Sequence, residues 1–247
     1  MRILVINPNT MPEMTALVAR VIQPHLPPET TLVPVTGRFG AQYVASRSAS
    51  AIAAHAALDA FAEHGEGCDG VYLACFGDPG LLALKEIARV PVVGMAEASS
   101  RLAAAKAGRF SMVTGGERWG PMLREFVSAI GFGENLAAVE TVAPTGADIA
   151  RDPEGSIAML AEACRRTAAR DGAGAVILGG AGLAGLAAKV QPHVEVPVIC
   201  SAEAGIRILL DALGKPSEKP ESGDLSLPAP VPSTGLSDKL SRLLAQP

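Results

Sequence analysis

The residues best suited to chemistry stand in the stretch ACFGDPGL at 74–81, at the end of an apolar run. Cys75 follows that run, and the Gly and Pro residues after it predict a tight turn into a helix. A thiol at a helix N-terminus has a lowered pKa, so Cys75 is predicted to form a thiolate that accepts a proton from carbon or attacks an electrophile. The alternative is a small buried residue that only packs against the turn.

A second stretch, AVILGGAGLAGL at 175–186, repeats this pattern with Gly180 in the place of the cysteine. Exposed backbone N–H groups in such a glycine-rich run can hold a carboxylate or an oxyanion. The run lacks the GxGxxG spacing and the following acidic residue of a dinucleotide site, and the chain carries no phosphate-binding loop pattern. The sequence therefore points to a small organic substrate and not to a nucleotide.

Polar residues follow other predicted strands. Asn7 and Thr10, in NPNT, can donate hydrogen bonds to a carboxylate or an amide carbonyl, and they are equally ordinary turn and cap residues. Thr114 stands at the equivalent strand end of the second half and has the same two interpretations. Asp78 either binds a ligand or caps a helix.

The four cysteines form no CxxC pair, and no histidine stands at metal-ligand spacing from them; they are Cys68, Cys75, Cys164 and Cys200. This pattern predicts reduced thiols in a cytoplasmic protein, with neither a disulfide framework nor a metal site.

Alternating strands and helices must position these residues. Nearly continuous apolar runs separated by Ala-rich helical patterns predict a parallel α/β fold. The predicted strands are 3–6, 31–35, 71–74, 90–93, 110–113, 137–142, 175–178 and 196–199. The predicted helices are 11–23, 48–64, 80–88, 97–107, 119–130, 155–170, 183–190 and 203–213.

An internal repeat relates the two halves of the chain. A shift of 105 residues, from Cys75 to Gly180, lays 71–81 on 176–186, and one inserted residue then lays PVVGMAEAS at 91–99 on PVICSAEAG at 197–205. Ligands bind beyond the carboxyl ends of parallel strands, so two such halves can share one cleft. The predicted domains are 1–96 with 206–247, and 97–205. Residues 214–235 are predicted to be a flexible tail, and 236–246 a short amphipathic helix.

The composition of the chain limits the kinds of molecule that it is expected to bind. The chain has 247 residues, 49% of them hydrophobic, with 21 basic and 25 acidic side chains and only 4% aromatic residues. Without a basic stripe, nucleic acid and membrane surfaces are poor partners, and a small molecule is expected. The chain shows no signal-peptide pattern and no apolar run of about 18 residues, which predicts a cytoplasmic location.

The motifs INPNT, CFGDPGL and VILGGAGLAGL resemble those of the Asp/Glu/hydantoin racemase superfamily, and most closely its hydantoin and allantoin racemase branch. The resemblance runs from residue 1 to about residue 212. It implies two pseudo-symmetric parallel-sheet α/β domains around an interdomain cleft, no cofactor and no metal, and often a homo-oligomer. It also implies two opposed cysteines, which remove and return a proton on opposite faces of the substrate carbon.

Carried onto this chain, the resemblance makes Cys75 the first catalytic cysteine and leaves Gly180 in the position of the second. The remaining groups that it assigns to substrate binding are Asn7, Thr114 and the backbone N–H groups of Phe76, Gly77, Ala181 and Gly182, to which the residue pattern adds Thr10 and Asp78. Three alternatives account for the missing side chain at residue 180. The thiol of Cys200 approaches from that side, an ordered water occupies the space, or the glycine makes room for a larger substrate.

The first hypothesis is a cofactor-independent racemase or epimerase acting at an acidic C–H of a hydantoin-like or amino-acid-derived substrate, with Cys75 as acid and base. The alternatives are a one-cysteine decarboxylase or isomerase of the same superfamily, and a non-catalytic binding or accessory protein that lost the second cysteine.

Overall fold

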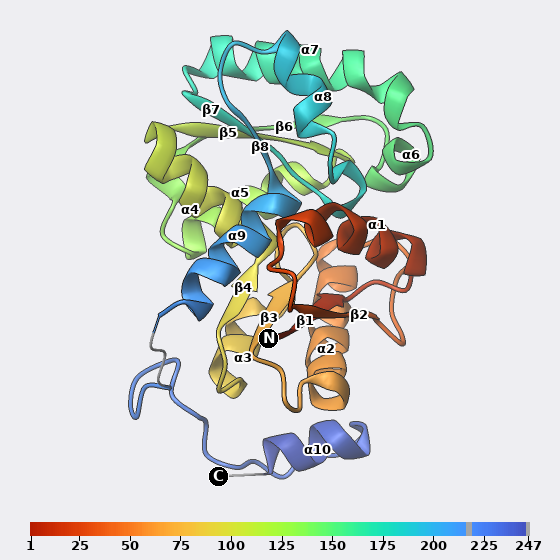
Figure 1. The fold of residues 1–247 in the computed structure, drawn as a ribbon, viewed down its shortest axis with the longest axis vertical. Coiled ribbons are helices and arrows are strands. Elements are labelled where there is room, and N and C mark those ends of the chain that lie inside the picture. Colours follow the sequence, from red (N-terminus) through yellow and green to blue (C-terminus); the bar gives the residue numbers. More distant parts are fainter. Residues whose placement is uncertain (216–218, 246–247) are drawn as a thin grey trace.

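Two four-stranded sheets organise the computed structural model, which describes residues 1–215 and 219–245 (Figure 1). The first sheet has the order β2-β1-β3-β4 and the second the order β6-β5-β7-β8, and all their paired strands are parallel. The strands are β1 (Arg2–Asn7), β2 (Thr31–Thr36), β3 (Gly70–Leu73), β4 (Val92–Gly94), β5 (Phe110–Gly115), β6 (Leu136–Val142), β7 (Ala175–Leu178) and β8 (Val198–Cys200). The parallel α/β prediction is confirmed, and the identical strand order of the two sheets confirms the internal repeat.

Helices connect the strands and cover the sheets. The α-helices are α1 (Pro12–Ile22), α2 (Arg47–His64), α3 (Leu81–Ile87), α4 (Met95–Ala107), α5 (Trp119–Ala129), α6 (Gly146–Arg151), α7 (Pro153–Asp171), α8 (Ala187–Val190), α9 (Ser201–Leu213) and α10 (Asp238–Leu244). Short 3₁₀ turns are η1 (Gln23–His25), η2 (Gly133–Asn135), η3 (Ala181–Leu183) and η4 (Gln191–His193).

Several element bounds differ by one or two residues from the sequence predictions, and two helices differ more. The helix predicted over 183–190 is α-helical only over α8, because the glycine-rich segment before it forms the 3₁₀ turn η3 and a loop. Helix α6 was not predicted, although it begins with a capping box. The side chain of Thr145 accepts from the N–H of Asp148, and the Asp148 carboxylate accepts from the N–H of Thr145.

Burial explains why the strands are continuous apolar runs. Helices lie on both faces of each sheet (Figure 1), so every residue of β3, β5 and β7 is buried. The side chains of Val and Ile residues fill both sides of a sheet that is covered twice. This rigid apolar framework fixes where each strand ends, and the strand ends carry the candidate site.

Helix α9 joins the two halves. It follows β8 of the second sheet, yet it packs against β3 and β4 of the first sheet as well as against α4 and α1. The hydroxyl of Tyr72 on β3 donates to the backbone oxygen of Ala202 over 3.2 Å. The division of the chain into domains at 96/97 and 205/206 stays a prediction.

The C-terminal segment returns to the first half. Residues 219–235 contain no helix or strand, whereas residues 216–218 of the predicted flexible tail lie outside the described residues. The predicted terminal helix is present as α10, although residue 246 also lies outside the described part. It packs on α2, where Leu240 is 1% exposed and Lys239 pairs with Glu63 over 3.0 Å.

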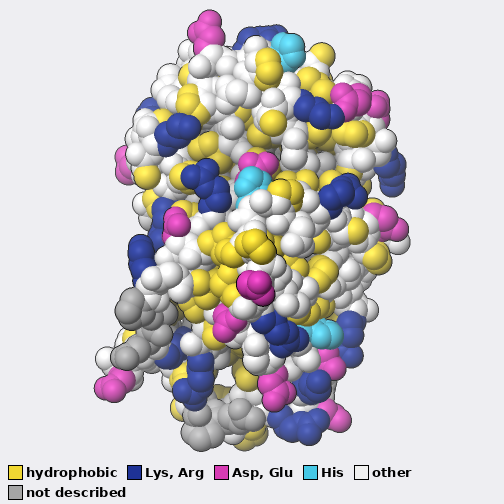
Figure 2. Space-filling model, viewed as in Figure 1, with side chains coloured by type: hydrophobic (Ala, Val, Ile, Leu, Met, Phe, Trp, Pro, Cys, Tyr) yellow, Lys and Arg dark blue, Asp and Glu magenta, His cyan; other side chains and the backbone are white. Residues whose placement is uncertain are grey.

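The surface carries a mixture of charges. On the face drawn in Figure 2, Lys and Arg side chains are interspersed with Asp and Glu side chains, and apolar side chains gather near the middle. Within the described ranges, no helix is long and apolar enough to cross a membrane.

Candidate active site

A pocket lies where the carboxyl ends of the two sheets meet. The empty space between its walls is about 490 Å³, a figure that includes open solvent at its mouth. Its lining residues are Asn9, Met14, Tyr43, Val44, Ala74, Cys75, Phe76, Thr114, Trp119, Gly146, Gly180, Ala181, Gly182 and Leu183. Six of the predicted site residues therefore come together here: Cys75, Phe76, Thr114, Gly180, Ala181 and Gly182.

Register explains why Cys75 and Gly180 share the pocket. The pairing of β1 with β3 ends with Leu73, and the pairing of β5 with β7 ends with Leu178. Cys75 and Gly180 each follow two residues after these positions, so the same strand geometry places them in equivalent positions in the two halves.

The thiol of Cys75 does not have the lowered pKa that the sequence predicted. Helix α3 begins only at Leu81, so Cys75 does not stand at its N-terminus, and Cys75 is only 8% exposed. Burial, together with the nearby carboxyl group of Asp78, raises the pKa of Cys75 to about 12. The prediction of a lowered pKa is wrong, and Cys75 is a thiol at neutral pH.

Asp78 acts as a helix cap. Its carboxylate accepts from the backbone N–H groups of Ala96, over 3.0 Å, and Glu97, over 2.7 Å, at the start of α4. Burial raises the pKa of Asp78 to about 8, against the opposing effect of these N–H groups. Of its two predicted roles the structure displays the cap, for α4 and not for the helix that follows it in the chain. The side chain does not line the pocket, and neither does Gly77.

The NPNT segment reaches the pocket through a residue that the sequence analysis missed. Asn7 donates to Asn9 Oδ1 over 2.8 Å and to Thr15 Oγ1 over 3.0 Å, which turns it away from the pocket. Asn9 Oδ1 also accepts from the N–H of Met11 over 2.9 Å. Within the described chain Asn9 Nδ2 has no acceptor, and Asn9, 6% exposed, lines the pocket. Its amide is thus a fixed donor.

Thr10 lies outside the pocket. Its backbone N–H donates to the backbone oxygen of Ala41 over 3.2 Å, which ties the NPNT segment to the loop after β2. The only feature of the sequence that could have identified Asn9 as a pocket residue is its spacing from Asn7, two residues earlier. Asn7 orients the Asn9 side chain by donating to its Oδ1.

The wall around Gly180 is built from backbone. Gly180 has φ 128° and ψ 144°, a region that glycine alone adopts readily. Its N–H donates to Ser201 Oγ over 3.2 Å, and its oxygen accepts from Leu183 over 3.0 Å. The N–H groups of Ala181 and Gly182 lie inside this turn and donate to no acceptor among the described residues, and both residues line the pocket.

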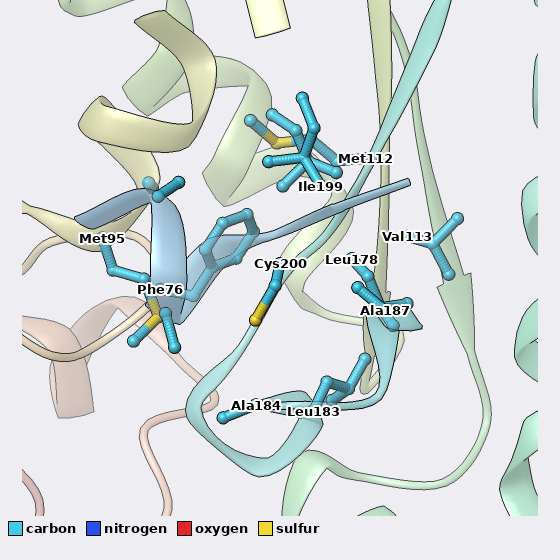
Figure 3. Close-up of a cluster of buried hydrophobic side chains, with 14 of the residues drawn as sticks. Phe76, Met95, Met112, Val113, Leu178, Leu183, Ala184, Ala187, Ile199 and Cys200 are labelled. Carbon is cyan, nitrogen blue, oxygen red and sulfur yellow. The ribbon is translucent and has the colours of Figure 1, made fainter. Parts of the chain in front are cut away.

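Cys200 does not reach the pocket. Figure 3 shows its sulfur in a cluster of buried apolar side chains that includes Phe76 and Leu183. Backbone N–H groups, that of Gly185 foremost, favour its thiolate, yet burial outweighs them and raises the pKa of Cys200. The structure therefore does not bring together Cys200 and Cys75 as a catalytic pair.

Two aromatic residues complete the pocket and were not predicted. Trp119 stands at the start of α5, and Tyr43 lies in the loop between β2 and α2. The Tyr43 hydroxyl donates to the oxygen of Gly115 over 3.1 Å and accepts from the N–H of Gly146 over 3.3 Å. Burial raises the pKa of Tyr43, and the Gly146 N–H opposes that rise. Residues so distant in sequence give no local signal.

The pocket is uncharged. Of the described residues that line it, none is Lys, Arg, His, Asp or Glu. Across the described ranges, no group of three or more His, Cys, Asp or Glu side chains is arranged to hold a metal ion.

Comparisons with known proteins agree with this architecture. The model of the family described as Asp/Glu/Hydantoin racemase matches residues 3–209. A hydantoin racemase of Pseudomonas sp. (strain NS671) is 34% identical over 223 residues, covering 89% of this chain and 89% of that protein. A hydantoin racemase of Paenarthrobacter aurescens is 33% identical over 226 residues, covering 90% and 96%. The solved structure of allantoin racemase from Klebsiella pneumoniae has a TM-score of 0.85 and 34% identity, covering 98% of both chains.

Proposed function

Because the chain belongs to the Asp/Glu/hydantoin racemase family, we propose that it is a cofactor-independent racemase or epimerase of a hydantoin-like substrate, with Cys75 as its acid and base. The observation that carries the proposal is the single thiol of Cys75 in an uncharged pocket at the meeting point of the two sheets. The hydantoin and allantoin racemases that resemble this chain support the same reaction class.

The uncharged lining favours a neutral ring over a free amino acid. An amino acid carries a carboxylate and an ammonium group, and burying both without charged partners is unfavourable. A hydantoin-like ring instead presents neutral carbonyl and N–H groups. Asn9 Nδ2, the Thr114 hydroxyl and the N–H groups of Ala181 and Gly182 supply donors for its carbonyl oxygens.

These donors also serve the reaction. Removal of the proton from the carbon beside a carbonyl moves negative charge to the carbonyl oxygen, giving an enolate. Fixed N–H and O–H donors stabilise that oxygen because they need no reorientation when the charge develops. The thiolate of Cys75 takes the proton and becomes the thiol, and the reverse transfer returns a proton to the carbon.

A second candidate is a one-cysteine decarboxylase or isomerase. The observation that favours it is the raised pKa of Cys75, which leaves this residue as a proton donor at neutral pH. Such an enzyme protonates an enolate from one face only, and so it needs no thiol at position 180.

Solvent deuterium incorporation separates these functions. Single enantiomers of 5-substituted hydantoins, allantoin and amino acids are incubated with the protein in D₂O, and deuterium and configuration at the stereocentre are followed together. Incorporation with inversion is expected for a hydantoin. Incorporation with retention indicates one-base exchange, and binding without incorporation favours the accessory protein. Absence of incorporation for every substrate contradicts the racemase proposal.

A further inference from the structure

The pocket holds one thiol, whereas inversion of a carbon centre needs proton transfer on both faces. Building on the proposed racemase function, we propose that the phenol of Tyr43 is the acid–base group on the face opposite Cys75, in place of a second cysteine. Among the described lining residues, only Cys75 and Tyr43 ionise in the pH range of water. The amide of Asn9, the hydroxyl of Thr114 and the indole of Trp119 do not.

The position of Tyr43 fits the second face. Tyr43 belongs to the first half of the chain, but its hydroxyl is held by backbone groups of the second half, at Gly115 and Gly146. A Cβ at position 146 would lie 3.7 Å from the Tyr43 ring and 3.8 Å from Leu183 Cδ1, and a Cβ at position 180 would lie 3.4 Å from that same Cδ1. Tyr43, Leu183 and Gly180 therefore form one wall, whereas Cys75 lies in the turn after β3.

The two hydrogen bonds of the hydroxyl act differently on proton transfer. The hydroxyl proton is held by the backbone oxygen of Gly115 over 3.1 Å, and it has to turn toward the substrate before it is given away. The N–H of Gly146 donates to the phenol oxygen, so it stabilises the phenolate that remains after a proton is given away. Cys75 and Tyr43 line the same pocket, so a substrate held there lies beside both acids.

The proposed step balances in protons. The Cys75 thiolate takes the C–H proton from one face of the substrate and becomes a thiol, and the enolate forms. The Tyr43 hydroxyl then gives its proton to the same carbon from the other face and becomes a phenolate. The product is the opposite enantiomer, and the enzyme returns to its starting state when Cys75 loses a proton to solvent and Tyr43 regains one. The opposite enantiomer reacts by the reverse sequence.

The test separates inversion from exchange. Tyr43→Phe is compared with the unaltered protein on single enantiomers of 5-benzylhydantoin in D₂O, after subtraction of the uncatalysed rate. We expect exchange with retention to persist, because Cys75 remains, and inversion to fall at least tenfold relative to exchange. The matched control is Tyr72→Phe, which removes the same hydroxyl from a buried residue outside the pocket and is expected to keep the wild-type ratio. An unchanged ratio in Tyr43→Phe, or an equal loss of both processes, overturns the proposal.

If the Tyr43→Phe protein does not fold, a second measurement tests the same proposal without removing the hydroxyl. The chain has only two tyrosines, so growth on 3-fluorotyrosine in the Tyr72→Phe background labels position 43 alone. Fluorine makes the phenol more acidic with little change in size. We expect the ratio of inversion to exchange to change while exchange stays the same, and an unchanged ratio overturns the assignment. Absence of exchange in the unaltered protein instead overturns the proposed function itself.

Discussion

The turns after β3 and β7 occupy equivalent positions in the two sheets, yet they are built from different groups. The first carries the thiol of Cys75, the ring of Phe76 and the capping carboxylate of Asp78. The second, from Gly179 to Gly182, carries no side chain larger than the methyl group of Ala181. It contributes backbone N–H groups and space.

The difference arises from how the halves pack on one another. The Phe76 ring of the first turn lies against Gly179 of the second, where a Cβ would come within 2.2 Å of the ring. The second turn therefore has no side chain at residue 179, because the Phe76 ring of the first turn occupies that space. A symmetric fold sets equivalent positions for two groups, but at the second position, residue 180, it is the backbone φ of 128°, and not lack of room, that opposes a side chain.

The largest expected effect is at the thiol that makes the two turns different. Cys75→Ala should lower both racemisation and deuterium exchange by about 10²–10⁴-fold, the usual contribution of an acid–base residue. Cys68→Ala, at another buried cysteine outside the pocket, should keep both rates. The check is chiral chromatography with mass spectrometry, and full exchange in Cys75→Ala would place the reactive atom elsewhere.

The pH dependence of exchange should reveal the buried thiol. Since the pKa of Cys75 is about 12, its thiolate fraction, and with it the rate of C–H deprotonation, should rise about tenfold per pH unit through neutrality. Asp78, with a pKa of about 8, ionises within this range. The charge of ionised Asp78 is one cause of the raised Cys75 pKa, so the rise in rate should flatten near pH 8, where Asp78 becomes charged.

Two variants check this interpretation of the pH profile. Asp78→Asn should remove the flattening, and Cys75→Ala measured at each pH provides the blank for solvent-catalysed exchange. A rate that is independent of pH between 6 and 9 would mean that Cys75 reacts with a much lower pKa than burial gives it.

The packing between the turns has its own test. Gly179→Ala should destabilise the protein by about 1–3 kcal/mol, because the new methyl group overlaps the Phe76 ring. Phe76→Ala removes the ring, so the double variant should be more stable than the sum of the single changes implies, with a coupling of about 0.5–3 kcal/mol. Denaturant unfolding of the four proteins measures the cycle. Strict additivity would show that the two residues do not meet.

The smallest expected effect on activity comes from restoring a thiol to the second turn. A Cβ at position 180 has room, 3.4 Å from Leu183 Cδ1 and 3.6 Å from Thr114 Oγ1, but φ 128° strains any side-chain-bearing residue by about 1–3 kcal/mol. Gly180→Cys should raise inversion relative to exchange despite this strain. Gly180→Ala and Gly180→Ser carry the same strain without a thiol, so they should leave the ratio unchanged.

Combining Gly180→Cys with Tyr43→Phe tests whether the two positions serve the same face of the substrate. The gain from Gly180→Cys should be larger in the Tyr43→Phe background, where the phenol no longer serves the second face. If Gly180→Cys folds and leaves the ratio unchanged in both backgrounds, then residue 180 does not face the reacting carbon.

Local patterns in the chain were enough to predict the framework of strands and helices. Apolar runs at strand length and Ala-rich helical patterns are local properties of the chain, so the strands, most helices and the repeat were predictable. The strand ends followed, and with them the positions of Cys75, Thr114 and Gly180. Helix α6 was also readable from its Thr145 and Asp148 caps, although it was not predicted.

Tertiary structure decided the chemistry of the site. The pKa of Cys75 depends on burial and on Asp78, whose side chain caps a helix 18 residues further on, so the turn sequence alone suggested the wrong direction. Asn9 became the donor because Asn7 and Met11 hold its other atom. Tyr43 and Trp119 entered the pocket from elements that are neighbours only after the two sheets pack, because contacts between distant segments leave no local pattern in a sequence.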